Sequence, residues 1–160
     1  MKAKRQFVRE GDWFAVPLRT GGYALGVVAR KGKGGILLGY FFGPRRERVP
    51  TIEDAHDLTP DDAVLVERFG HLGLRDRRWP LLGPRATWRR EDWPMPKFGR
   101  LEPYANRGWI VIRGDDPGRP IREEPCTMEV ASKLLPEGLD GAGAVEIGLT
   151  KLLSTPSSTK

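Results

Sequence analysis

Two short apolar runs separated by a pair of glycines most constrain how this chain of 160 residues can fold. Residues 13–18 and residues 23–30 are both rich in aromatic and β-branched side chains, which favour strands. Gly21-Gly22 between them suits a tight hairpin turn, because glycine takes positive φ without strain. A second glycine-rich turn, residues 31–35, leads into a third apolar run, residues 36–42. The pattern predicts an antiparallel meander, either a curved sheet or a small barrel.

The rest of the chain predicts a mainly β (α+β) fold with two helices. Thr51 and the acidic residues after it predict a short helix near 52–58, because a threonine cap and early carboxylates stabilise a helix start. Apolar residues at helical spacing predict a C-terminal helix over 143–153. Further strands are predicted over 63–69, 79–82 and 109–113.

Two stretches are predicted to lack regular structure. Residues 43–50 are predicted to form a basic loop, and residues 84–108 carry too many prolines for a helix or a sheet. The aromatic residues of the second stretch should pack it against the body of the protein. We expect a single domain over residues 1–153 and a disordered polar tail over residues 154–160.

Composition excludes several classes of protein. Hydrophobic residues make up 39% and charged residues 30%, so the chain is not disordered by composition. It has no apolar run of about 18 residues that could cross a membrane, and no apolar signal core follows the basic N-terminus. Cys126 is the one cysteine, so no internal disulfide forms. These features predict a cytoplasmic protein that does not interact with membranes.

The charge is unevenly spread along the chain. Residues 1–50 hold 11 Lys and Arg against 3 Asp and Glu, whereas residues 51–160 hold 16 against 18. A basic excess of this kind is compatible with nucleic-acid binding. The basic residues sit in predicted turns between strands, however, which favours the simpler interpretation of a solvated basic face.

Residues for catalysis are scarce. A hydrolytic triad needs a nucleophile, a histidine and an acid in hydrogen-bond reach, and neither His56 nor His71 lies in a motif that pairs it with Cys126. These three residues also fall short of any zinc pattern. The acidic residues over 53–62 are better explained as a helix start than as a cation site, and the turn around Lys33 lacks phosphate-loop spacing. We therefore expect no catalytic residues, no cofactor and no metal.

Five tryptophans in a chain of this length are many. Trp13 and Trp109 lie in predicted strands and should be core, and Trp79 and Trp93 should be packing residues. Trp88 could equally pack or bind a partner, because Trp and Arg are enriched at binding hot spots. The candidate partner-binding residues are Trp88, Arg89, Arg90, Arg45, Arg46 and Arg48.

Several short motifs occur in a recognisable order. They are Gly11-Asp12, Gly26, the acidic helix after Pro50, Leu74-Arg75, Arg78-Trp79-Pro80, Trp93-Pro94 with Phe98, and a C-terminal helix with Glu146 and Leu149. In this order the chain resembles the immunity protein 26 family of bacterial polymorphic toxin systems over most of residues 7–153. The resemblance implies a mostly β fold, no catalysis and binding to a cognate toxin. It assigns no toxin-binding residues, because immunity surfaces vary with the toxin.

Two alternatives come from other classes of protein. A Gly-Asp pair before a strand and a hairpin is also the start of small basic barrels of the SH3-like kind. In such a barrel, Lys31, Lys33 and the arginines over 45–48 could hold an RNA backbone beside Tyr40 and Phe42. An enzyme that uses a metal at the acidic residues over 53–62 is the least favoured alternative. Nucleic acid is thus the second choice of partner after a toxin protein.

Overall fold

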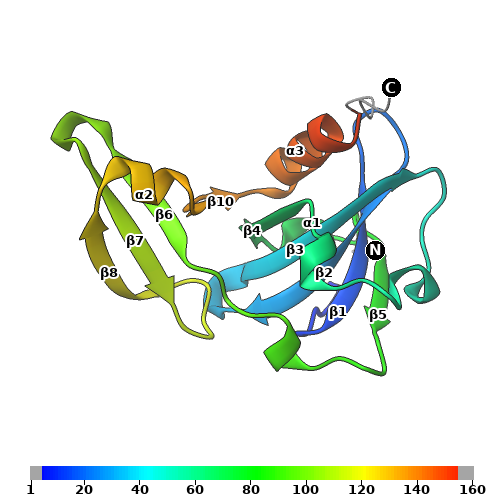
Figure 1. The fold of residues 1–160 in the computed structure, drawn as a ribbon. Helices are drawn as coiled ribbons and strands as arrows, with labels where there is room; N and C mark the ends of the chain where they lie inside the picture. The colour runs from blue at the N-terminus through cyan, green and yellow to red at the C-terminus, as the bar shows by residue number, and fades with distance from the viewer. Residues whose placement is uncertain (1–4, 155–160) are drawn as a thin grey trace.

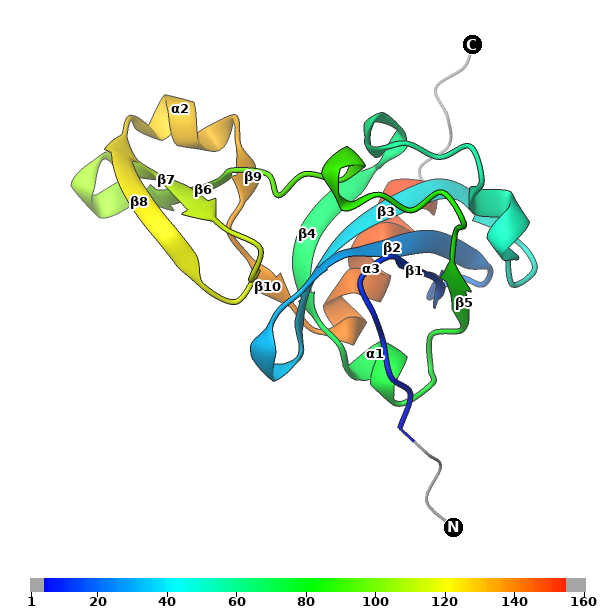
Figure 2. The same cartoon turned by 90° about the horizontal axis from the view of Figure 1, so that it is seen from below.

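A computed structural model describes residues 5–154, and within them the chain forms two open sheets (Figures 1 and 2). The larger sheet has six strands in the order β10-β4-β3-β2-β1-β5, and the smaller has four in the order β8-β7-β6-β9 in this part of the chain. Neighbouring strands are antiparallel except for two short parallel pairs, β10 with β4 and β6 with β9. The mainly β fold is confirmed as curved sheets rather than a closed barrel.

The predicted meander forms the centre of the larger sheet. It consists of β1 (Asp12–Pro17), β2 (Tyr23–Lys31) and β3 (Ile36–Arg46). The turn between the first two strands places Gly21 and Gly22 at φ of +95° and +80°, a region that favours glycine. The third strand runs longer than predicted. Residues 43–46 belong to it, and Arg46 pairs with Tyr23, so the prediction of a loop starting at residue 43 was wrong.

Three short strands complete the larger sheet. They are β4 (Leu65–Gly70), β5 (Leu81–Pro84) and β10 (Leu139–Asp140), of which the first two confirm predicted strands within two residues. A short helix, α1 (Leu72–Arg75), turns the chain between β4 and β5. The helix predicted near 52–58 is a short 3-10 helix over Ile52–Ala55, and further 3-10 turns occupy Lys33–Gly35, Pro60–Asp62, Arg90–Asp92 and Pro103–Ala105.

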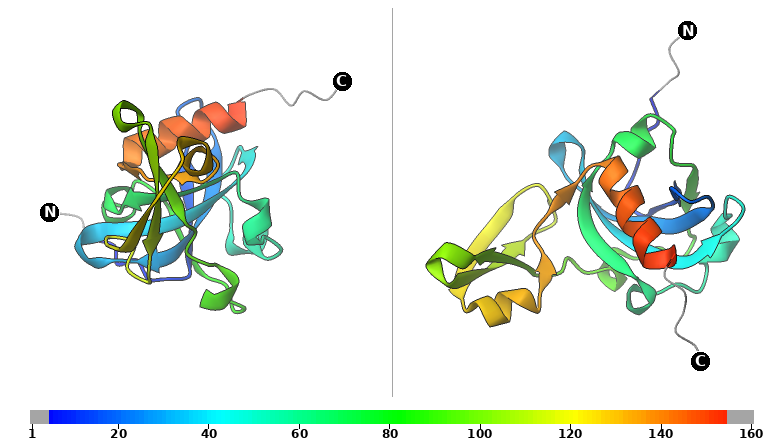
Figure 3. Two further views of the ribbon diagram at one scale, coloured as in Figure 1. Left: turned by 60° about the vertical axis from the view of Figure 1, so that its left-hand side comes forward. Right: turned by 90° about the horizontal axis from the view of Figure 1, so that it is seen from above.

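The predicted C-terminal helix, α3 (Ala142–Ser154), lies across one face of the larger sheet (Figure 3). Val145 and Leu149 from this helix join Phe14 and Phe69 of the sheet in a buried cluster. Trp79 stacks on both of these phenylalanine rings, with ring centroids 5.7 and 5.8 Å apart, which confirms it as a packing residue. Ser154, predicted to begin the polar tail, is the last residue of the helix, and the rest of that tail lies outside the described residues.

The smaller sheet was mostly missed by the sequence prediction. It contains β6 (Phe98–Glu102), β7 (Arg107–Arg113), β8 (Pro120–Cys126) and β9 (Leu135–Pro136), with α2 (Met128–Ser132) packed on one face. Only β7 was expected. Residues 84–108 were predicted to be irregular, but Pro96 and Pro103 flank residues 98–102, which contain no proline and can form a strand.

A second buried cluster joins the two sheets. It combines Trp13 and Phe42 of the larger sheet with Phe98 and Val111 of the smaller one, around Trp93 from the connecting segment. The ring of Trp93 meets Trp13 edge-on at 5.7 Å. The predicted packing of residues 84–108 against the body is therefore confirmed for its central aromatic residues. None of the helices over residues 5–154 is long and apolar enough to cross a membrane.

Candidate functional site

The six residues expected to bind a partner fall into two groups at opposite ends of β1. Trp88 covers Gly11, which precedes the strand: a Cβ on this glycine would lie 2.9 Å from the indole ring. Arg45 donates from Nε to the carbonyl oxygen of Gly21, which follows the strand, at 2.8 Å. The structure therefore keeps the tryptophan and its neighbouring arginines apart from the arginines at the end of β3.

In the first group, the side chains are largely occupied by contacts within the protein. Trp88 is partly buried and stacks on Trp93 at 5.9 Å. Arg90 donates two hydrogen bonds to Glu10, at 2.6 and 2.7 Å, and pairs with Asp115 at 2.9 Å. These bonds hold the pKa of the Arg90 guanidinium above its usual range. Arg89 is exposed beside Glu91 and remains open to a partner.

In the second group, Arg45 and Arg48 are exposed, whereas Arg46 is partly buried and lies 3.6 Å from Asp54. The same aspartate accepts a 2.8 Å hydrogen bond from the backbone of Thr51 and so caps the 3-10 helix. Asp62 caps the next short helix in the same way through Thr59. The acidic stretch over 53–62 thus stabilises two helix starts, where the sequence indicated one.

The remaining residues considered for chemistry lie far apart in the fold. His56 contacts Asp57 on the surface, His71 follows β4, and Cys126 ends β8 in the smaller sheet. Over residues 5–154 no group of three potential metal ligands occurs. Trp109, expected in the core, is only partly buried, and its indole donates to Glu102.

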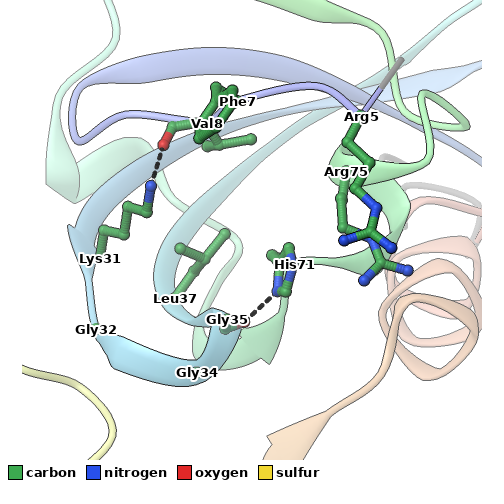
Figure 4. A pocket seen from close by; sticks show the side chains of 10 residues that line it. All are labelled: Arg5, Phe7, Val8, Lys31, Gly32, Gly34, Gly35, Leu37, His71 and Arg75. Atoms are coloured by element: carbon green, nitrogen blue, oxygen red, sulfur yellow. Dashed lines mark hydrogen bonds between the residues drawn. The ribbon is translucent and has the colours of Figure 1, made fainter. Parts of the chain in front are cut away.

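A basic cavity that the sequence did not reveal lies beside the turn between β2 and β3 (Figure 4). Its volume is about 310 Å³, and its walls come from the N-terminal segment, this turn and α1. Arg5, Lys31, His71 and Arg75 supply its nitrogen-bearing side chains. No lining residue among those described is Asp, Glu, Ser or Cys, so this part of the chain offers a ligand only basic and apolar groups.

Glycines shape the turn that forms one wall of the cavity. Gly34 and Gly35 have φ of +74° and +81°, and the carbonyl oxygen of Gly35 points at His71. That oxygen accepts hydrogen bonds from the backbone nitrogen of His71 at 2.9 Å and from Nδ1 at 3.0 Å. Because a carbonyl only accepts, Nδ1 carries the proton in this bond, and the ring is held in one orientation.

Backbone hydrogen bonds bring the cationic side chains of the cavity together. Gln6 donates from its backbone to the carbonyl oxygen of Arg75 at 3.0 Å and from its side chain to Leu74 at 2.9 Å, which ties the N-terminal segment to α1. Arg5 and Arg75 consequently line the same cavity (Figure 4). On the other side, Lys31 Nζ donates to the carbonyl oxygen of Val8 at 2.8 Å.

The architecture defines a mainly β protein with two open sheets that share a core. Residues 9–110 match the model of the family described as immunity protein 26. The match spans well over half of the chain, and the protein belongs to this family. It begins before β1 and ends within β7, so α3 with Glu146 lies beyond the matched segment. No curated protein and no solved structure matches the chain.

Proposed function

We propose that this protein binds a cognate bacterial toxin and neutralises it without catalysis of its own. The observation that carries the proposal is the match of residues 9–110 to the immunity protein 26 family. The surface supports it: exposed arginines such as Arg45, Arg48 and Arg89 and the basic cavity offer contacts to a protein partner. The cavity's lining, in turn, offers no serine, cysteine or carboxylate nucleophile among the described residues.

Neutralisation of this kind works by recognition alone. The immunity protein covers the active site or the substrate-binding surface of the toxin, and a few anchor residues supply most of the binding free energy. Complementary charge accelerates the encounter and excludes wrong partners. Because the first 50 residues carry a net charge of +8, the toxin surface that meets them should be acidic.

The first experiment is affinity purification of the tagged full chain from its native cells, with and without nuclease, followed by co-expression. We expect one large protein with a C-terminal toxin module to copurify whether or not nuclease is added. Expression of that module alone should stop growth, and co-expression of this protein should restore it. Recovery of ribosomal or RNA-linked proteins that disappear on nuclease treatment would instead favour binding to RNA and would contradict the proposal.

A further inference from the structure

We propose that the basic cavity beside the β2–β3 turn anchors an acidic segment of the toxin, by taking up an apolar side chain and an adjacent carboxylate. This inference rests on the proposed function and names the chemistry of the partner. The cavity's volume of about 310 Å³ suits a side chain or two of a protruding segment rather than a broad protein surface.

The cations of the cavity are arranged to hold a carboxylate. Arg75 pairs through Nε with Asp76 at 3.0 Å, a bond that does not use its terminal nitrogens. Arg5 lines the same cavity, and planar guanidinium groups bind carboxylates through two parallel hydrogen bonds. Lys31 uses one of its three N–H donors on Val8, so the ammonium group can serve a ligand as well.

Apolar side chains form the rest of the cavity. Val8 and Leu37 are buried beneath it, with 4% and 1% of their surface exposed. Phe7 stands at its rim with 84% of its surface exposed, which is unfavourable for a large aromatic ring without a contact. An apolar side chain of the partner, seated between Phe7 and Leu37, would remove this surface from water.

The surroundings favour a protein segment over a nucleic acid. An RNA backbone needs a continuous basic track, because its phosphates follow one another along the strand. The neighbouring hollow beyond Lys31 instead mixes Lys33 and Arg90 with Asp115 and Asp116, and Asp76 pairs with Arg75. Carboxylates therefore interrupt the positive charge around the cavity, whereas the described lining of the cavity contains none and suits one or two carboxylates of a ligand.

The test uses random heptapeptides displayed on phage, selected against the immobilised full chain. The selection is repeated against the Arg5→Glu/Arg75→Glu variant and, separately, against Phe7→Ser. Arg122→Glu serves as the matched control, because Arg122 is an exposed arginine on β8 in the other sheet. Far-UV circular dichroism and thermal melts establish that each variant folds.

We expect the wild type and the control to enrich peptides with Asp or Glu next to a large apolar residue. Synthetic copies of these peptides should bind both cavity variants about tenfold more weakly or worse, and their affinity should fall with salt. No enrichment, enrichment of peptides without acidic residues, or equal binding by the cavity variants would overturn the inference. Binding of RNA would overturn the inference as well. This outcome would be a fluorescent RNA of about ten nucleotides that binds the wild type, when such peptides do not, and that no longer binds the cavity variants.

The growth assay with the toxin separates this inference from the proposed function. If the wild type protects cells and both cavity variants protect them equally well, the cavity does not anchor the toxin, although the protein is still an immunity protein. If the wild type itself gives no protection against the copurified toxin, the proposed function fails whatever the peptides show.

Discussion

Glu67 in β4 is the residue whose protonation should most affect stability. It is partly buried, and its pKa is raised from 4.5 to about 8. Burial is the largest cause, and a hydrogen bond with Asp140 and the negative charge of that residue add to it. Between pH 4.5 and about 8, the folded state therefore keeps a proton on Glu67, whereas the unfolded state has already released it. The stabilising contribution of Glu67 is complete below pH 4.5, declines as the pH rises and is lost above about 8.

Glu67→Gln should remove this pH dependence, because an amide keeps a hydrogen-bond donor for Asp140 and does not titrate. We expect the variant to be more stable than the wild type by about 1 kcal/mol near pH 8.5 and to show little advantage near pH 5. Urea unfolding at both pH values measures this. Curves for the two proteins that shift in parallel with pH would show that Glu67 is already ionised in the folded state.

Gly35 offers a second test at the residue scale. A side chain at this position would be unfavourable for two reasons: φ is +81°, and a Cβ would lie 1.8 Å from His71 Nδ1. Gly34 is the matched control, because its φ of +74° is similar but nothing lies within 4 Å of its Cβ position. We expect Gly34→Ala to cost about 1 kcal/mol of backbone strain and Gly35→Ala about 2–4 kcal/mol in urea unfolding. Equal losses would mean that His71 moves aside freely.

At the scale of elements, local signals decided which strands could be predicted. The β1–β3 meander follows from apolar runs bounded by glycine turns, so the sequence was sufficient there. β8 carries Pro120, Pro125 and three charged residues, and no local pattern favours a strand. It forms because it pairs with β7 and because Arg100 of β6 reaches Glu123 at 2.8 Å, contacts that no short window of sequence contains. Prolines are tolerated there because β8 is an edge strand.

One carboxylate adds polar contacts to the apolar packing that attaches α3 to the larger sheet. Glu146 accepts hydrogen bonds from Trp79 Nε1 at 2.8 Å and from Arg19 Nε at 3.0 Å. Glu146→Ala should cost about 2–3 kcal/mol, because the indole N–H is left buried without a partner. Glu146→Gln keeps an acceptor for the indole and should cost less than about 1 kcal/mol, since Arg19 is half exposed. Urea unfolding compares the two, and similar losses would contradict a role for the indole bond.

For the whole molecule, the residue types of the candidate site could be predicted from the sequence, but their arrangement in space could not. The arginines and Trp88 were identified by residue type, but their separation by the length of β1 depends on the sheet register. The cavity combines residue 5, the turn at 31–35 and residues 71–75, which come together only because the turn accepts hydrogen bonds from His71 and Gln6 binds α1. Its glycine turn was visible in the sequence, but nothing local indicated which cations would surround it.

The shared aromatic cluster makes a prediction about the cooperativity of the molecule. Trp93 is 1% exposed and contacts both Trp13 in the larger sheet and the cluster that holds Phe98 of the smaller one. Neither sheet can lose its partner without exposing this core, so residues 5–154 should unfold as a single cooperative unit. Urea transitions followed by tryptophan fluorescence and by far-UV circular dichroism should therefore coincide in the wild type.

Trp93→Ala tests the coupling between the two sheets by removing a side chain of the shared cluster. Removing a buried indole should cost about 3–5 kcal/mol. Because the indole belongs to the cluster that the two sheets share, the variant's two transitions should also separate, with the smaller sheet unfolding at lower urea. Trp79→Ala is the matched control: it empties the core beneath α3, within the larger sheet alone, so its transitions should shift together. Two separate transitions in the wild type would instead show that the sheets are independent domains and that the cluster merely lies between them.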